Sequence, residues 1–571
     1  MDRLLVEIGT EEIPAGYIQP ALASFASILE KKLETMRIAH GTVHTFGTPR
    51  RLTIIVDNVA EKQTALALET QGPPARIALD ENGNPTVPGK KFAEKIGVSP
   101  RALKVRETEK GAYVYAIKTE RGNSARSVLK QMLPEVILAI NFPKTMRWAD
   151  LKIHFTRPIH SICALYGNGV IPFVVGDVKS GRYTFGHRFM APQKIKLSSP
   201  SEYLPALADA FVLADIPRRR KLLTEQMTQS VAKIGGQVIP DEELVDTVTH
   251  LVEYPAVSIG RFDDEFLLLP REILITAMRV HQKYFAVVDS NDHLMPYFVA
   301  INNTQAKDMG LVAKGHERVL RARLADAQFF FDADVKTTLD EKKEKLKAVL
   351  FQAELGSMFD KTGRVEALAG FLAGLQGVQQ DITHRISRAA SLCKADLVSH
   401  VVIEFPKLQG IMGRIYAHVQ NEPDSVAAAI EEHYRPAYAG GPLPETVEGA
   451  VLAIADKIDS ICGCFSIGLI PTGASDPYGL RRHANGIIQI ALDQQFAFSL
   501  NGLVRESLNF FGPKEDAERT EQADKIIDFL KGRMAHLLEE DGIARDVVAA
   551  VLAASDDTIQ TIWQKAHGLQ N

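Results

Sequence analysis

The sequence has little of what marks a secreted or zinc-binding protein. Four cysteines occur in 571 residues, and their irregular spacing is typical of reduced thiols in a cytoplasm rather than of a disulfide framework. Cys462 and Cys464 lie close together but lack the second ligand pair that a structural zinc site needs. The N-terminus has a short apolar run with acidic residues directly behind it, which does not resemble a signal peptide. We therefore expect a cytoplasmic protein.

Long apolar runs and an excess of one charge are also missing. No uninterrupted apolar run approaches the roughly 20 residues of a membrane-spanning helix, so no membrane association is expected. The 66 basic and 70 acidic residues give a formal net charge of −4, so there is no global basic signature. Any polyanionic partner must therefore be met by local clusters of Lys and Arg.

Signatures of metal and nucleotide chemistry are absent as well. No HxxxH or HExxH pair appears, so a histidine metal cluster is not indicated. Nothing matches a P-loop of the form Gly-x-x-x-x-Gly-Lys-Ser/Thr, and no adenylate-forming signature is visible. We therefore expect that this chain cannot make an adenylate by itself.

What is present falls into two parts. Up to about residue 340 the chain mixes strands and helices: 4–9 is typical of a buried strand, 21–36 has a helical period, and β-rich runs flank 47–51. The polar, broken stretch 71–100 predicts an insertion or surface segment. Residues 314–332 predict a long helix that the charged run after 339 continues, and beyond 345 the sequence is nearly all helical. The fold class is therefore α+β, with several domains.

Basic residues gather at a few places in the first part. Arg50 and Arg51 stand at the head of a strand, where guanidinium groups can meet a phosphate, although a solvated strand end is the alternative. The loop with Lys144, Arg147 and Trp148 can bind nucleic acid by charge and stacking, or it can be a helix end covered by the Trp.

The densest basic run is 218–221, at the start of a predicted helix. There the helix dipole disfavours cations by roughly 0.3–1 kcal/mol each. A charge run is usually a solvated face, but this unfavourable placement makes polyanion binding somewhat more attractive. Arg318 and Arg321 project from one side of the predicted long helix.

The helical stretch 391–482 carries carboxylates beside apolar helical stripes. These are Asp396, Glu404, Asp456 and Asp459. Such groups can ligate a metal, bind a partner's basic groups or end in solvent, and the choice decides whether the chain is a hydrolase.

Eight ordered motifs carry a resemblance to a known family over nearly the whole chain. They are LLVEIGTEEIPA (4–15), FGTPRRL (46–52), HQKYF (281–285), GHERVLRARLADAQFFFD (315–332), ELGSMFDK (354–361), CKADLVSHVVIEFPKLQGIMG (393–413), LAIADKID (452–459) and DPYGLRR (476–482). With these motifs the chain resembles the beta subunits of the bacterial two-subunit glycyl-tRNA synthetases.

The resemblance implies a division of labour between two kinds of subunit. The alpha subunit holds the glycine and ATP site and makes glycyl-adenylate, so ATP and Mg²⁺ are used there and no cofactor is expected on this chain. The beta subunit binds tRNA(Gly), and two alpha and two beta chains are needed to charge it.

The resemblance also implies a domain order. Residues 1–340 are expected to hold an α/β region with a domain like B3/B4 of the phenylalanyl enzyme's beta chain, 341–500 a helical domain of the HD phosphohydrolase type, and 501–571 a helical C-terminal segment. The anticodon-binding bundle of the family is expected to begin where this chain stops, so the chain is expected to lack it.

The HD pattern can be tested on residue types. A working HD domain binds metal through a His, a His-Asp pair and a later Asp. Ala395 and Asp396 fill the place of the His-Asp pair, Asp456 that of the later Asp, and Lys361 that of the first His. Because both histidines are missing and an ammonium opposes a cation, the resemblance implies a degenerate site with no metal and no catalytic residue.

Two other functions stay open. His384 and His400 lie nearby, and His400 shares a helical face with Asp396 at i, i+4, so a rearranged site would make the chain a metal-dependent HD-type phosphohydrolase. A purely architectural partner that only holds the alpha subunit in place is the third possibility.

In the leading interpretation the chain binds tRNA through basic surface residues. The candidates are Arg50, Arg51, Lys144, Arg147, Arg218, Arg219, Arg220, Arg318, Arg321, Arg481 and Arg482. Asp476 stands just before the last pair, so an internal ion pair is the alternative there.

Overall fold

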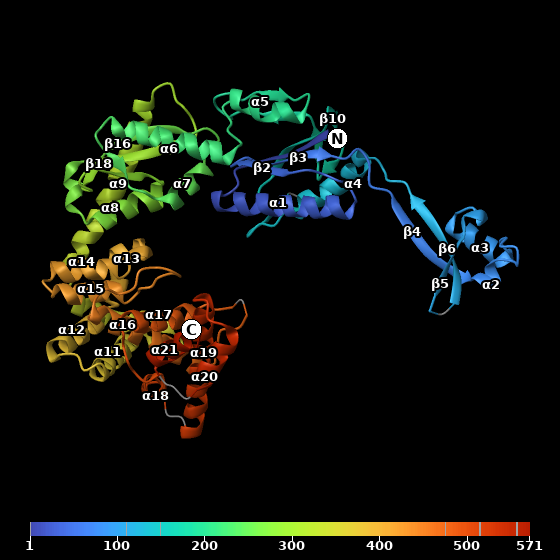
Figure 1. Ribbon diagram of the computed structural model, residues 1–571. Coiled ribbons are helices and arrows are strands. Elements are labelled where there is room, and N and C mark those ends of the chain that lie inside the picture. The colour runs from blue at the N-terminus through green and yellow to red at the C-terminus, as the bar shows by residue number, and fades with distance from the viewer. Residues whose placement is uncertain are drawn as a thin grey trace. The chain divides into compact units, whose positions relative to one another are not determined.

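The computed structural model describes residues 2–109, 111–148, 150–473, 475–512, 515–554 and 558–570 (Figure 1). The chain forms two compact units. The first comprises Met1–Arg261 and Lys283–Glu317, and the second comprises Phe262–Gln282 and Arg318–Asn571. Strands dominate the first unit and helices the second, so the expected α+β class is confirmed at that level.

The first unit is built on a sheet whose centre is β1 (Asp2–Thr10). β1 pairs antiparallel with β3 (Arg51–Val59) on one side and with β9 (Ile159–Tyr166) on the other. The strand order is β11-β12-β9-β1-β3-β2, with β10 paired to β9. The outer strands are β2 (Val43–Thr48), β10 (Gly169–Val170), β11 (Val174–Val175) and β12 (Val178–Gly181). The strand predicted at 4–9 is confirmed.

Both faces of β1 are buried, and its side chains alternate between them. Val6 and Ile8 pack with the helices α1 and α4 on one face, whereas Leu5 packs against α5 on the other. These helices are α1 (Ala15–Thr35), α4 (Ala125–Leu138) and α5 (Tyr203–Asp209). Glu7 shares the face of Leu5 and is 2% exposed. A carboxylate so deeply buried needs partners within the protein.

The broken polar stretch belongs to an insertion with its own small sheet. Its strand order is β4-β6-β5, all antiparallel. The elements are β4 (Leu66–Pro74), α2 (Ala75–Ala78), α3 (Val87–Ile96), β5 (Lys104–Thr108) and β6 (Gly111–Glu120). Two further short strand pairs complete this part of the chain: β7 (Met146–Arg147) with β8 (His154–Phe155), and β13 (Tyr183–Phe185) with β14 (Lys194–Lys196).

A second antiparallel sheet closes the first unit, in the order β15-β17-β18-β16. The apolar sides of α6 and α7 pack on it through residues such as Leu223 and Val248. The elements are α6 (Ile216–Ala232), β15 (Gln237–Val238), α7 (Glu242–Thr249), β16 (Ala256–Arg261), β17 (Phe285–Val288) and β18 (Leu294–Asn302).

The second unit is helical apart from the short hairpin of β19 (Leu350–Gln352) and β20 (Gly356–Ser357). Its helices are α8 (Arg271–Ala277), α9 (Met309–Val335, which enters it from the first unit), α10 (Leu339–Lys345), α11 (Met358–Leu375), α12 (Gln380–Leu392), α13 (His400–Glu404), α14 (Ile411–Val419), α15 (Asp424–Glu432), α16 (Val447–Ser466), α17 (Leu480–Asp493), α18 (Leu500–Leu508), α19 (Asp516–Glu540), α20 (Arg545–Ala553) and α21 (Ile559–Gln570).

The central helix of this unit is α16. Every residue from Glu448 to Phe465 is buried, so the helix is covered on all sides. Its buried stretch nevertheless includes Asp456, Lys457 and Asp459. Charged groups in such a place must be paired, and their partners decide what this unit can do.

Two details differ from the predictions. The charged run after residue 339 does not continue the long helix, because Thr338 and Glu341 form a capping box that starts a separate helix, α10. The chain passes from one compact unit to the other between Glu317 and Arg318, within α9, so the expected boundary at 340 lies inside the second unit. Among the described helices, none has the length and apolar character that crossing a membrane requires.

Candidate functional site: cationic surfaces and a buried lysine–aspartate cluster

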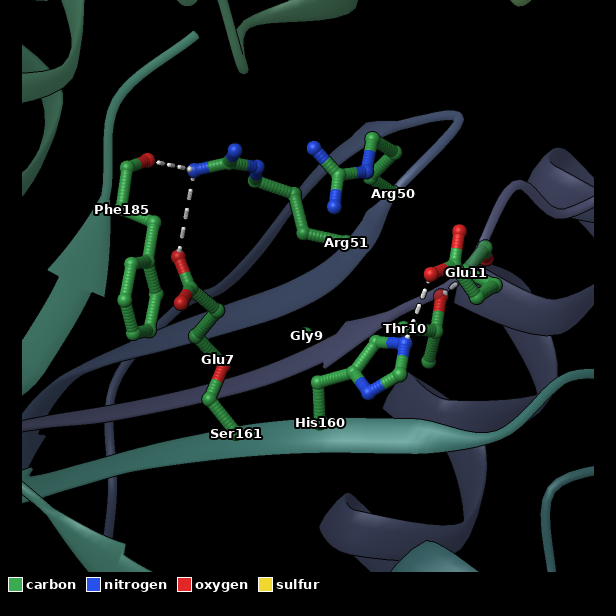
Figure 2. Close-up of a pocket in the computed structure, with 9 residues that line it drawn as sticks. All are labelled: Glu7, Gly9, Thr10, Glu11, Arg50, Arg51, His160, Ser161 and Phe185. Atoms are coloured by element: carbon green, nitrogen blue, oxygen red, sulfur yellow. Dashed lines mark hydrogen bonds and ion pairs between the residues drawn. The ribbon is translucent and has the colours of Figure 1, made fainter. Parts of the chain in front are cut away.

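Arg50 and Arg51 stand over a hollow of about 290 Å³ where the edges of β1, β3 and β9 meet. Figure 2 shows Glu11 and His160 on one side of it and Arg51, Glu7 and Phe185 on the other. The two arginines are neighbours in sequence but not in environment. Arg51 begins β3 and is buried, whereas Arg50 lies in the turn before it and is half-buried.

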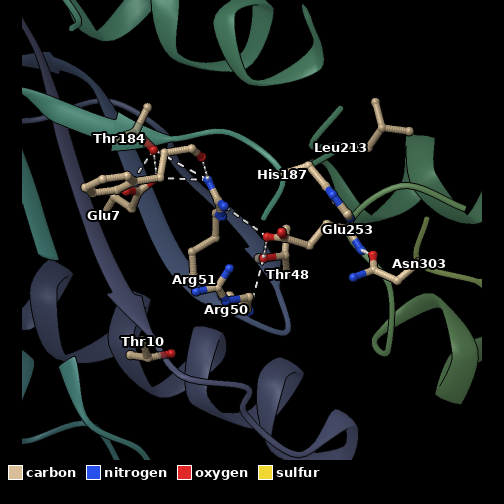
Figure 3. Close-up of polar contacts among 12 residues, drawn as sticks. Glu7, Thr10, Thr48, Arg50, Arg51, Thr184, His187, Leu213, Glu253 and Asn303 are labelled. Carbon is tan, nitrogen blue, oxygen red and sulfur yellow. Dashed lines mark hydrogen bonds and ion pairs between the residues drawn. The ribbon is translucent and has the colours of Figure 1, made fainter. Parts of the chain in front are cut away.

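Arg51 is held by groups of the chain itself (Figure 3). Its Nη2 lies 2.9 Å from Oε1 of Glu253, and its Nη1 donates to the Phe185 carbonyl at 2.9 Å. Glu7 accepts hydrogen bonds from the hydroxyls of Thr184 and Tyr203, and lies 3.7 Å from Arg51 Nη1. Burial opposes the charge on Glu253, but Arg51, the hydrogen bond from Thr48 and the nearby Arg50 together outweigh it and lower the pKa of Glu253 below its ordinary value.

Arg219 is the second buried arginine of the expected surface set. It lies in α6, is fully buried, and donates from Nε to the Thr249 carbonyl at 2.8 Å and from Nη1 to the Gly47 carbonyl at 2.9 Å. The expectation that all eleven candidates lie on the surface is therefore wrong for Arg51 and Arg219. Both guanidinium groups join β-strands and loops of the first unit and donate to groups of the chain itself.

The other candidates of the first unit differ in how their charges are balanced. Lys144, Arg147 and Arg218 are exposed. Arg220 is engaged, because it forms ion pairs with Glu242 and Asp246 of α7.

In the second unit Arg318 and Arg321 are exposed on α9, and Arg321 Nε lies 2.9 Å from Oδ2 of Asp263. Arg481 and Arg482 open α17. Asp476 does not pair with their side chains. Its carboxylate accepts instead from the backbone N–H groups of Leu480 and Arg481, at 2.8 and 3.0 Å.

The start of α17 therefore keeps its positive charge. Arg482 donates to the Ala437 carbonyl at 2.8 Å, which leaves the charge uncompensated. Burial and the nearby Arg481 lower the pKa of Arg533 on α19 below its ordinary value. Arg481 thus lies close enough to Arg533 for the two charges to repel, while Glu540 offsets part of the charge on Arg533. Among the described residues, Arg481 and Arg482 make no ion pair with a carboxylate.

The positions that match the HD pattern lie around α16, in the core of the second unit. Lys361 of α11 and Lys394 at the end of α12 approach the two carboxylate oxygens of Asp456, each at 3.1 Å. Lys361 also lies 2.9 Å from Oδ2 of Asp459, whose Oδ1 accepts from Arg364 at 2.7 Å. All these carboxylate oxygens face cations of the same chain.

The electrostatics agree with the geometry. Burial opposes the charge on Asp456, but Lys361 and Lys394 outweigh it and hold its pKa well below the ordinary value. Burial likewise opposes the charge on Lys361, yet Asp456 and Asp459 raise its pKa. Burial and Lys394 lower the pKa of His433 well below its ordinary value. Its Nδ1–H donates to the Ile430 carbonyl, and its Nε2 accepts from Lys394 at 2.8 Å.

The remaining HD-like positions do not converge on Asp456. Ala395 is buried and apolar, and the charged residue of that turn is its neighbour Lys394. Asp396 accepts from the backbone N–H groups of Gly410 and Gly413, at 2.6 and 3.1 Å, and so orders the start of α14. Burial raises the pKa of Asp396 to about 6.

The rearranged metal site does not form. A turn at Ser399 separates Asp396 from α13, so His400 and Asp396 do not share one helical face. His400 pairs instead with Asp334, at 2.8 Å. Across the described parts of the chain, no group of three or more His, Cys, Asp or Glu side chains has an arrangement that could hold a metal ion.

Comparison with known proteins decides the family. The family described as glycyl-tRNA synthetase beta subunit matches residues 4–553. The chain belongs to this family. The glycine–tRNA ligase beta subunit of Desulfatibacillum aliphaticivorans is 51% identical over 570 residues, which cover 100% of this chain and 82% of that protein. That of Desulforapulum autotrophicum is 52% identical over 555 residues, covering 97% of this chain and 80% of the relative.

A third relative, the glycine–tRNA ligase beta subunit of Geobacter sulfurreducens, is 46% identical over 556 residues, covering 97% of this chain and 81% of its own. The resemblance inferred from the eight motifs is thereby confirmed. The chain functions as the beta subunit of a glycine–tRNA ligase and is thus part of an aminoacyl-tRNA synthetase.

Several residues of interest are not predicted by the sequence patterns. Lys394 stands one position before the HD-like pair, so the pattern does not include it. Glu7 gave a usable signal, since a carboxylate inside the apolar run LLVEIG predicts a buried cation nearby. The exposed rings of Tyr183 and Phe185 also had a signal, because they alternate with Thr184 along one short strand.

Proposed function

We propose that this chain is the tRNA(Gly)-binding subunit of a ligase with two alpha and two beta chains. In this proposal the alpha subunit binds glycine, ATP and Mg²⁺ and makes the adenylate, and the assembly works in the cytoplasm with the rest of translation. The beta-subunit family supports the division of labour, because such a subunit acts together with an alpha subunit.

The observation that carries tRNA binding by this chain is the cationic start of α17. Like charges held close together cost free energy, and an anionic ligand offsets that cost. Here the carboxylate of Asp476 accepts from backbone N–H groups and forms no ion pair with the guanidinium groups of Arg481 or Arg482. We propose that these residues contact phosphates, together with the half-buried Arg50 and the exposed Lys144, Arg147, Arg218 and Arg318. Arg220 and Arg321 are weaker candidates because carboxylates already pair with them.

The HD-type phosphohydrolase is not favoured by any contact in the second unit. A metal bound at Asp456 would have to displace two ammonium groups that already neutralise it, and would leave them buried without counter-charges. We propose that this core is a degenerate HD-type domain that serves as a scaffold. Its present role is to hold α11, α12 and α16 together.

Replacing Arg481 and Arg482 together by Ala tests the proposal. If each contacts one phosphate, the double variant binds tRNA(Gly) more weakly, and the slope of log K against log salt falls by up to about two. Titration of labelled tRNA(Gly) with the full chain at several salt concentrations measures both. Arg545→Ala is the matched control, because that side chain is 86% exposed and pairs with Glu539. An unchanged salt slope in the double variant would remove Arg481 and Arg482 from the binding surface.

A further inference from the structure

The hollow beneath Arg50 has the features of a built site (Figure 2). Its floor includes Gly9, near the end of β1, and the cavity has a volume of about 290 Å³. A Cβ at Gly9 would stand 2.3 Å from Oγ of Ser161, so a side chain there would displace the Ser161 hydroxyl that lines the cavity.

Two polar groups at this cavity have no partner within the part of the chain that the structure describes. The Arg50 side chain makes no hydrogen bond or ion pair there, and its Nε is fully buried. The Ser161 hydroxyl likewise has no hydrogen-bond partner among the described residues. Arg51 and Glu7, by contrast, are held by hydrogen bonds and ion pairs of the chain itself, although the buried Arg51 Nε has no partner among the described residues, and they form a fixed rear wall. An unpaired guanidinium over a polar cavity fits an anionic group such as a phosphate.

A second cavity of about 380 Å³ continues from the first and shares His160, Ser161 and Phe185 with it. On β13 the side chain of Thr184 is buried, and those of Tyr183 and Phe185 are 38% and 42% exposed. Because side chains alternate along a strand, the two rings lie on the same face. Both line this second cavity, together with Lys179, Lys194 and the acidic Asp177.

Lysines accompany these rings. Nζ of Lys194 lies 4.0 Å from the centre of the Tyr183 ring, and Lys179 lines the same cavity. Aromatic rings beside Lys and Arg are what proteins use to hold unpaired nucleotides, because bases stack on the rings and the cations meet the phosphates. An Arg without a partner beside two exposed aromatic rings fits a nucleotide better than a protein partner.

We propose that the two adjoining cavities form one groove for unpaired nucleotides of tRNA, with bases on Phe185 and Tyr183 and a phosphate on Arg50. Ser161 and Glu11 then lie at hydrogen-bonding positions for a ribose or a base edge. This deepens the proposed tRNA-binding function and rests on it. Unpaired nucleotides come from the single-stranded 3′ end or the loops of tRNA, and the same chemistry is present in free AMP.

The direct probe is a short single-stranded RNA with the sequence of the tRNA(Gly) 3′ end, titrated with the full chain. Phe185→Leu and Tyr183→Leu keep an apolar surface but remove the stacking, so each weakens binding of this RNA about ten-fold. Arg50→Gln also weakens binding of this RNA, and the difference from wild type is larger at lower salt, because a phosphate contact is lost. Tyr438→Leu is the control, since Tyr438 is 63% exposed in the other unit; it leaves binding unchanged.

Further arms separate the sources of the ligand and the two proposals. A duplex RNA of equal length binds without dependence on Phe185 or Tyr183, and Arg481→Ala with Arg482→Ala weakens intact tRNA but not the short RNA. Removing the unpaired 3′ nucleotides of tRNA(Gly) abolishes the effect of Phe185→Leu if the 3′ end is the occupant, whereas persistence of the effect assigns the groove to a loop.

Equal binding of the short RNA by wild type and both ring variants overturns the proposed groove. If AMP binds to the groove but the short RNA does not, the assignment of the groove to tRNA is overturned. Loss of tRNA binding in the α17 variant alone bears only on the proposed function.

Discussion

The groove of the first unit and the cluster around α16 in the second both contain charged side chains, but these have opposite roles. In the cluster, Asp456 and Asp459 are neutralised by Lys361, Lys394 and Arg364, and all five side chains are largely buried. At the groove, Arg50 stands unpaired over an open cavity. Charges that satisfy one another hold a fold together, whereas a charge left without a partner at an opening is available to a ligand. Residue type alone does not distinguish the two cases.

The sharpest way to break this comparison is to remove a cation from the closed cluster. Lys361→Met leaves Asp459 and Asp456 buried with too little positive charge, which is expected to destabilise the second unit by about 3–5 kcal/mol. Hydrogen exchange of the α16 amides and urea unfolding measure the loss. Lys525→Met is the control, because Lys525 forms an exposed i, i+4 pair with Glu521; it should cost at most about 0.5 kcal/mol. Equal stability of Lys361→Met and wild type would show that the cluster is not closed.

Adjacent arginines of α6 sharpen the same contrast within one basic run. Arg219→Met removes hydrogen bonds to the buried Thr249 and Gly47 carbonyls, so a loss of about 2–4 kcal/mol is expected. Arg218→Met alters an exposed side chain, so stability stays nearly constant while the salt slope of tRNA binding falls by about one. Thermal unfolding and tRNA titration of both variants separate the two roles. A stable Arg219→Met with reduced tRNA affinity would reverse the assignment.

The last contrast concerns Lys457, whose amino group donates to the carbonyls of His433 and Arg435. Burial lowers the pKa of Lys457 to about 7. In the unfolded chain a lysine has a pKa of about 10.4. Between pH 7 and about 10 the unfolded state therefore binds more protons than the folded state, and stability rises with pH. Lys457→Met should flatten this rise in urea midpoints measured at pH 7 and pH 9.5. Identical slopes for variant and wild type would contradict the shift.

The family and the fold class could be predicted because they depend on local patterns. The strand at 4–9, the helices beyond 345 and the eight motifs are all legible in short windows of sequence. The break before α10 is legible too, since Thr338 and Glu341 have capping-box spacing, but the helical character of the charged run after it hides the break.

The candidate site was less predictable because burial is a property of the folded chain. Arg50 and Arg51 are adjacent residues of the same type. Because β3 starts at Arg51, its guanidinium points inward to Glu253, which lies 202 residues away in the chain. Lys394 is likewise given its meaning by Asp456, on a helix 62 residues further on. Contacts at such separations leave no trace in local periodicity.

The central claim is that this chain itself binds tRNA(Gly) through open cationic and aromatic surfaces while its HD-like core stays closed. The most direct test is a titration of labelled tRNA(Gly) with the chain in the absence of the alpha subunit, at increasing salt, for wild type and for Arg50→Gln with Phe185→Leu. The account predicts salt-dependent binding by wild type and weaker binding with a smaller salt slope for the double variant. Binding that appears only when the alpha subunit is added would contradict it.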